Sequence, residues 1–272
     1  MPDDGVGRLL RWRDEQLGVP PAVGRVRAHL DEVAPATTTV RLPLHPELLL
    51  PGGTPSAGVA SLVADIGLTT SVVAALPHAL AVTTISMTVD HLGPTPPSGS
   101  LVAVCTAAAY EEGRPQHATG TVVDATGREV AAVSGWFLPA VVQAHAAERV
   151  GLVQEVPSAH LHDLLGFTVP EGNGGSFAFV AREALSNITG TLHGGVGALA
   201  CDTAGEAVLA PEGRLLTSAF SYLRPTPRGG AVTVRADVVR RGRRTATAQC
   251  SVVGADGRRA LQATVVAALD GP

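Results

Sequence analysis

The stretch Asn187-Ile-Thr-Gly-Thr-Leu-His-Gly-Gly-Val-Gly-Ala-Leu-Ala-Cys-Asp202-Thr-Ala-Gly-Glu-Ala207 joins a glycine-rich turn to an amphipathic segment that carries one central carboxylate. Apolar residues recur at helical spacing after Gly194, which predicts a helix from Gly194 to about Leu209. The first N–H groups of such a helix lack partners within it, and the positive end of the helix dipole adds to their pull on a carbonyl oxygen. Glycine allows close approach to the backbone. The stretch therefore indicates acyl-group chemistry.

An earlier segment repeats this stretch at a constant offset. Thr54–Asp65 aligns with Thr191–Asp202, with threonine, glycine, valine, leucine and aspartate in matching positions. Three more pairs follow in the same order along the chain: His91–Pro96 with Tyr222–Pro227, Gly113–Arg114 with Gly242–Arg243, and Asp124–Arg128 with Gly254–Arg258. Four landmarks in a conserved order favour a duplication over chance similarity.

Each half predicts one long helix among several strands. The expected segments of the first half are a strand at 38–44, a helix at 56–75 and strands at 82–92, 101–110, 118–124 and 130–137. Those of the second half are a strand at 177–183, the helix at 194–209 and strands at 215–223, 231–240, 245–253 and 260–268. Glycine-containing turns between the strands indicate antiparallel hairpins, and one helix against such a sheet is an α+β arrangement.

The expected domain organisation follows from these segments. We expect an N-terminal extension at 1–33 with an amphipathic helix near 9–17, a first domain at 34–140, a linker at 141–160 and a second domain at 161–272.

Composition limits the classes of partner. The chain has 272 residues, of which 45% are hydrophobic, and a net charge of −4, so we expect no nucleic-acid partner. Three separated cysteines suggest neither a disulfide framework nor a zinc site, and we expect no metal. No targeting segment or apolar run of membrane-spanning length is evident, so we expect a cytoplasmic protein without a membrane partner.

Several motif residues resemble a known family. Asn187, Leu192–Gly195 and Asp202–Ala204 resemble the motif of hotdog-fold acyl-CoA thioesterases of the phenylacetate-pathway (PaaI-like) type, and Tyr222–Pro225 is similar to that family's strand ending. The match covers about residues 160–270, and the first half carries the pattern in degenerate form.

The resemblance implies two tandem hotdog domains, each a curved antiparallel sheet wrapped around one long helix. They would pair as a pseudo-dimer, a double hotdog, and the chain could form homo-oligomers through its sheets. The implied activity is hydrolysis of an acyl-CoA thioester to free acid and CoA, without cofactor or metal.

Helix geometry separates the two ends of the motif. Asp202 lies eight residues after Gly194, which is about 12 Å along the helix axis. A catalytic base must lie within about 3 Å of the group it acts on, so Asp202 cannot serve its own helix's N-terminus. If the two duplicated helices lie antiparallel, each N-terminus faces the carboxylate of the other. We therefore expect composite sites between the two halves.

The repeat is uneven, which favours one of these two sites. The first half has altered residues at the oxyanion end: Leu50, Ser56 and Ala57 stand in place of Asn187, His193 and Gly194. At the carboxylate end it keeps Asp65, followed one turn later by Thr69, where the second half has Asp202 and Glu206. The second-half oxyanion end paired with Asp65 and Thr69 is thus the complete site, and Asp202 faces the poorer one.

The predicted catalytic roles follow from the charge that develops on a thioester. The Gly194 N–H, with the Asn187 side chain, would stabilise the oxyanion. Asp65 would act as general base on water or attack the carbonyl directly, with Thr69 orienting the water or the carboxylate. His193 would either take part or simply cap the turn.

Substrate contacts are expected from Gly195 and from two arginines, Arg224 and Arg243, as phosphate ligands for coenzyme A. Two other functions stay open at this point. A hotdog enoyl-CoA hydratase would carry a histidine soon after its aspartate, and neither Asp65 nor Asp202 has one within ten residues. A non-catalytic acyl-CoA-binding double hotdog would explain the altered first-half motif.

Overall fold

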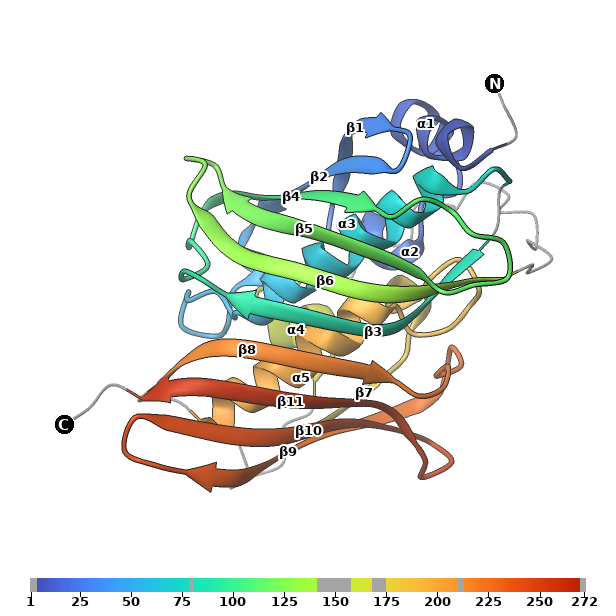
Figure 1. Cartoon of the computed structure of the whole chain (residues 1–272). Helices are drawn as coiled ribbons and strands as arrows, with labels where there is room; N and C mark the ends of the chain where they lie inside the picture. The colour runs from blue at the N-terminus through green and yellow to red at the C-terminus, as the bar shows by residue number, and fades with distance from the viewer. Residues whose placement is uncertain (1–3, 79–80, 141–157, 168–174, 210–212, 270–272) are drawn as a thin grey trace.

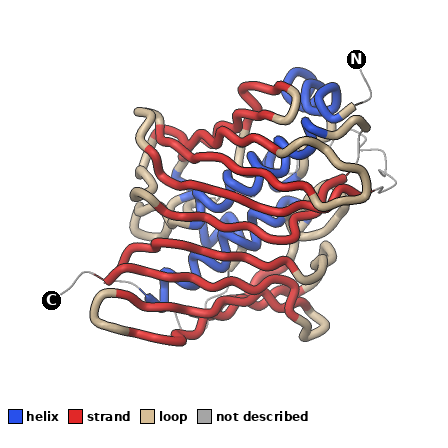
Figure 2. Tube along the Cα trace, in the orientation of Figure 1, coloured by secondary structure: helices blue, strands red, loops and turns tan. Residues whose placement is uncertain are grey.

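A computed structural model describes residues 4–78, 81–140, 158–167, 175–209 and 213–269. Its strands form one 11-stranded antiparallel sheet, and two long helices lie side by side against one face of that sheet (Figures 1 and 2). The helices are α3 (Gly58–Ala75) and α5 (Gly194–Leu209). The helix and sheet layers confirm the predicted α+β class.

The strand order is symmetric about the junction of the two halves: β1-β2-β4-β5-β6-β3-β8-β11-β10-β9-β7. In the first half the strands are β1 (His29–Ala34), β2 (Thr37–Leu44), β3 (Ala81–His91), β4 (Gly99–Ala107), β5 (Gln116–Asp124) and β6 (Glu129–Ala140). In the second they are β7 (Ser176–Val180), β8 (Gly213–Tyr222), β9 (Ala231–Arg241), β10 (Thr245–Gly254) and β11 (Arg259–Leu269). Pairing of β3 with β8 makes the two sheets continuous.

Loops before the two long helices repeat each other closely. The short 3-10 helices η1 (Pro46–Leu48) and η2 (Glu183–Leu185) occupy equivalent positions. The Leu50 N–H then donates to the Thr54 carbonyl at 2.7 Å, and the Asn187 N–H donates to the Thr191 carbonyl at 2.8 Å. Each loop turns on a glycine with φ near +75°, a conformation that L side chains rarely adopt. The structure thus repeats what the sequence duplication predicted.

The long helices cross at close range because glycine lies at each crossing. A Cβ on Gly58 would lie 2.7 Å from the Leu199 carbonyl oxygen, and one on Gly195 would lie 3.0 Å from that of Leu62. The two contacts are related by the same pseudo-two-fold as the sheet. By its length and apolar composition, helix α3 could cross a membrane. However, 89% of this helix is buried inside the protein, as expected of a core helix.

The N-terminal region contains a strand that was not expected from the sequence. β1 lies almost wholly within the predicted extension and pairs with β2, so it extends the first sheet. The expected helix near 9–17 is α1 (Gly5–Glu15), which starts earlier because the Asp4 side chain accepts the Gly7 N–H at 2.7 Å. Gly5 donates its N–H to the Leu76 carbonyl at the end of α3. The extension therefore covers one end of the core helix.

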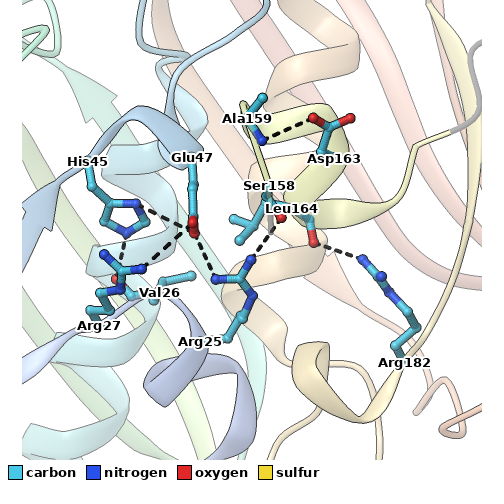
Figure 3. Close-up of polar contacts among 10 residues, drawn as sticks. All are labelled: Arg25, Val26, Arg27, His45, Glu47, Ser158, Ala159, Asp163, Leu164 and Arg182. Atoms are coloured by element: carbon cyan, nitrogen blue, oxygen red, sulfur yellow. Dashed lines mark hydrogen bonds and ion pairs between the residues drawn. The ribbon is translucent and has the colours of Figure 1, made fainter. Parts of the chain in front are cut away.

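Polar contacts join the extension to the first half and to the end of the expected linker (Figure 3). Arg25, at the end of α2 (Pro21–Arg25), donates to Glu47 of η1 at 2.7 Å and to Ser158 at 2.8 Å. Ser158 precedes α4 (Leu161–Leu165), whose three leucines are fully buried. Residues 141–157 of the expected linker lie outside the described residues.

Candidate active site

Asp65 lies on α3 directly opposite the N-terminus of α5, and it is 2% exposed. The His193 Nδ1 atom is 3.5 Å from the Asp65 Oδ2 atom. A Cβ built on Gly194 would stand 3.1 Å from both carboxylate oxygens, so a side chain there would press on Asp65. The carboxylate of one half thus meets the helix start of the other, the pairing that the sequence predicted.

The peptide groups at the start of α5 are held in a fixed orientation. The Gly195 N–H donates to the His193 Nδ1 atom at 3.1 Å, and the Tyr222 hydroxyl donates to the Gly194 carbonyl at 3.2 Å. We find no acceptor for the Gly194 N–H within the described parts of the chain. This N–H therefore remains available to a substrate carbonyl oxygen beside Asp65.

Thr84 of β3 is a site residue that sequence reasoning missed. Its hydroxyl donates to the Asp65 Oδ1 atom at 3.0 Å. The register of β3 against β6 shifts just after Thr84, an irregularity of the kind that re-aims side chains near active sites. Thr69, the predicted partner, is half-buried one turn along α3, and the hydroxyl that bonds Asp65 among the described contacts is that of Thr84. Nothing in the sequence fixes how far β3 lies from α3.

Burial dominates the charge balance of this pair. It raises the pKa of Asp65, against the lowering influence of His193, Thr84 and the Gly195 backbone. It also lowers the pKa of His193, although Asp65 favours the protonated ring. Each pKa shift runs against the attraction between the two groups, so desolvation outweighs that attraction and favours the neutral His193 ring. A neutral ring whose Nδ1 accepts the Gly195 N–H caps the helix, the simpler of the two roles considered for it.

Asn187 organises the loop before the site. Its Oδ1 atom accepts the N–H groups of Thr189 and Thr191 at 2.9 and 3.1 Å, and its Nδ2 donates to the Thr191 hydroxyl at 2.9 Å. These contacts hold the turn at Gly190 in shape. No bond from the Asn187 side chain to Asp65 or to α5 appears among the described contacts.

The two predicted phosphate ligands lie at different places. Arg224 is exposed just beyond the end of β8, close in sequence to Tyr222. Arg243 is exposed in the β9–β10 turn, where the neighbouring Arg241 donates to the Val208 carbonyl at the end of α5. Val208 is about 21 Å along α5 from Gly194. Arg243 thus lies near the end of α5 that is far from Gly194, and its role as a phosphate ligand stays a prediction.

Asp202 occupies the pseudo-symmetric position and is fully buried. Its Oδ2 atom accepts the Ser61 hydroxyl at 2.5 Å and lies 3.9 Å from the His91 Nε2 atom. Burial raises the pKa of Asp202 to about 7, with Ser218 and Ser61 opposing the shift. Its Oδ1 atom has no hydrogen-bond partner among the described residues. Asp202 therefore faces a second polar cluster, separate from Gly194.

The N-terminus of α3 completes this second cluster in a different way from that of α5. The Gly58 N–H donates to the Ser56 hydroxyl at 3.1 Å, as the Gly195 N–H does to His193. The Ala57 N–H, however, donates to the Glu206 Oε1 atom at 2.8 Å, and the Ser56 hydroxyl donates to Oε2 at 2.5 Å. The start of α3, equivalent to that of α5, is thus occupied by a carboxylate of the protein itself.

Comparisons with known proteins agree with this architecture. Residues 181–268 match the model of the acyl-CoA thioesterase N-terminal domain family. Similar solved structures include an acyl-CoA thioesterase II, TesB2, from Mycobacterium marinum, with 12% identity, a TM-score of 0.58, and 92% of this chain and 98% of that one covered.

Two further solved structures have the same fold. A Lactobacillus plantarum protein named for oleoyl thioesterase activity has 10% identity, a TM-score of 0.61, and coverage of 89% of this chain and 98% of its own. The 12:0-ACP thioesterase from Umbellularia californica has 9% identity, a TM-score of 0.55, and coverage of 85% and 94%. A search of curated protein sequences gave no match.

At such identities the solved structures establish the fold alone, and the family model matches residues 181–268. Both agree with the motif around Asn187–Ala207 and with the helix pairing described above. The chain is a double-hotdog protein, and residues 181–268 of its second half match the acyl-CoA thioesterase N-terminal domain family.

Proposed function

We propose that this protein hydrolyses acyl-CoA thioesters at a composite site formed by Asp65 of the first half and Gly194 of the second. The observation that carries the proposal is the position of a buried carboxylate against a helix N-terminus whose Gly194 N–H has no acceptor among the described residues. Such an N–H stabilises a developing oxyanion, and a carboxylate beside it can supply the base or the nucleophile.

The chemistry requires no cofactor. In one route Asp65 takes a proton from water, the water oxygen bonds to the carbonyl carbon, and the Gly194 N–H binds the resulting oxyanion. Collapse then breaks the C–S bond, and the proton held by Asp65 passes to the departing thiolate. In the other route the Asp65 carboxylate attacks the carbonyl carbon, the C–S bond breaks and the CoA thiolate leaves an anhydride behind. Water then hydrolyses the anhydride and supplies the proton that the thiolate takes up. Both routes yield a free acid and CoA.

The surrounding residues have positioning roles in this proposal. Thr84 orients the Asp65 carboxylate, and Tyr222 and His193 hold the Gly194–Gly195 peptide group from its two ends. Because Gly195 uses its N–H in this way, Gly194 is the donor that faces the substrate. Arg224 remains the arginine proposed for the phosphates of CoA.

The test is hydrolysis of short, medium, long and aromatic acyl-CoAs, followed with a thiol reagent. Release of free thiol above the level of an Asp65→Asn variant is expected for at least one class. If no thioester releases thiol although the protein binds acyl-CoA, the protein is a binder and the proposal is wrong. Consumption of an enoyl-CoA without thiol release would instead identify a hydratase.

A single-turnover reaction in ¹⁸O-labelled water tests for the anhydride route. When water attacks the aspartyl carbonyl of the anhydride, one unlabelled Asp65 oxygen passes to the acid product and ¹⁸O enters the Asp65 carboxylate, a result that general-base catalysis does not give. General-base catalysis places the label in the acid product only. Mass spectrometry of the peptide that contains Asp65 reads the difference.

A further inference from the structure

We propose that the N-terminus of α3 is a carboxylate-binding site whose resident ligand is Glu206, and that this internal ligand closes the second thioester site. The carboxylate is bound through both oxygens, one to the Ala57 N–H at 2.8 Å and one to the Ser56 hydroxyl at 2.5 Å. A carboxylate at a helix N-terminus is further favoured by the helix dipole.

Pseudo-symmetry identifies what Glu206 replaces. Ala57 is the repeat counterpart of Gly194, so its N–H is the counterpart of the proposed oxyanion donor. Glu206 is likewise the counterpart of Thr69, a side chain too short to reach across in the same way. The substitution at one position on α5 thus fills the donor position at the start of α3. Only this equivalence rests on the proposed function; the carboxylate contacts stand without it.

The neighbouring Asp202 also makes a contact between the two helices. It is fully buried, and its Oδ2 atom accepts the hydroxyl of Ser61 on α3. Thr203 adds a contact of 3.2 Å to the Ser56 hydroxyl. The second cluster therefore keeps the carboxylate of a catalytic site but closes the position where a substrate carbonyl would bind. One thioester would be hydrolysed per chain.

Removal of the ligand side chain tests the binding site directly. In Glu206→Ala the Ala57 N–H and the Ser56 hydroxyl lose their carboxylate, so the variant should melt at a lower temperature than the wild type in chloride. Sodium acetate or formate at the same ionic strength should raise its Tm saturably, by roughly 2–5 °C more than it raises that of the wild type. The probe is the small carboxylate itself, and no thioester is used.

Two control variants locate the effect. Glu112→Ala removes an exposed glutamate from the β4–β5 turn and should respond to acetate as the wild type does. The double variant Glu206→Ala with Ser56→Ala lacks one of the two donors and should lose most of the acetate response. An equal response in this double variant would place the anion elsewhere and overturn the proposal.

Other results would contradict the Glu206 proposal or the proposed function. If folded Glu206→Ala responds to acetate no more than the wild type does, the helix start is not a carboxylate site. A different result would be that acetate stabilises Glu206→Ala as expected while the wild type binds two non-hydrolysable acyl-CoA molecules per chain. In that case Glu206 does not close the second site. A protein that hydrolyses no thioester refutes the proposed function and leaves the acetate result intact.

Discussion

Replacement of Asp65 by asparagine is the most direct perturbation of the proposed site. Asparagine has nearly the same volume, and its Oδ1 can still accept the Thr84 hydroxyl, which lies 3.0 Å away in the wild type. The change therefore removes the base or nucleophile with little effect on packing. General-base catalysis contributes about 10²–10⁴-fold, so kcat/KM should fall by that factor, which corresponds to about 3–5 kcal/mol.

The thermal stability of Asp65→Asn should not fall with its activity. Burial raises the pKa of Asp65, so the ionised carboxylate destabilises the folded state at neutral pH. The neutral amide of the Asp65→Asn variant should leave Tm unchanged or raise it. The assay is thiol release at saturating and subsaturating acyl-CoA, with Tm measured on the same preparations. Loss of activity without loss of stability is the expected combination.

Two matched variants make the result interpretable. Asp256→Asn carries the same chemical change on the exposed β10–β11 turn and should be fully active. Asp202→Asn should keep most of the activity, because Asp202 faces the α3 end that Glu206 fills. An inactive Asp202→Asn beside an active Asp65→Asn would show that the pairing of helix ends is reversed.

The remaining predictions concern the same two clusters. Gly194→Ala should lower kcat/KM about 10–100-fold with secondary structure retained by circular dichroism, because its Cβ would stand 3.1 Å from both Asp65 oxygens. Because burial raises the pKa of Asp65, the acid limb of the pH profile of kcat/KM should have a midpoint above the ordinary aspartate value of 3.8. Thr84→Val removes a hydrogen bond that lowers this pKa, so it should move the midpoint higher. Thr69→Val should leave the midpoint unchanged. Asp202 has a folded pKa of about 7 against 3.8, so its contribution to stability is complete below pH 3.8 and is lost as pH rises through 7. The free energy of unfolding in urea should fall by up to about 4 kcal/mol over this pH range in the wild type. The fall that Asp202 causes should be absent in Asp202→Asn.

Much of the secondary structure could be predicted from local sequence patterns. The 3.6-residue period after Gly194 and the alternation of the strands predicted α5 and most strands to within a few residues, because local periodicity reflects which face is buried. β1 was missed because only six residues form it and its pairing with β2, not its own pattern, holds it in the sheet.

The position of Asp65 against the start of α5 was predictable because it depends on helix length and on the repeat. A distance of about 12 Å within one helix excludes Asp202 as a partner of Gly194, and the duplicated Asp65 is the alternative. These are properties of the chain itself. The repeat also predicted that the two ends are unequal, since His193 and Gly194 have no identical counterparts in the first half.

Tertiary structure decided which side chains meet across the two halves. Thr84 reaches Asp65 because β3 packs beside α3, and Glu206 reaches Ala57 because the helices cross where Gly58 and Gly195 allow close approach. Sequence spacing constrains partners within one helix or strand, where the rise per residue is known. It does not specify contacts between elements, which depend on how the whole sheet curves around the helix pair.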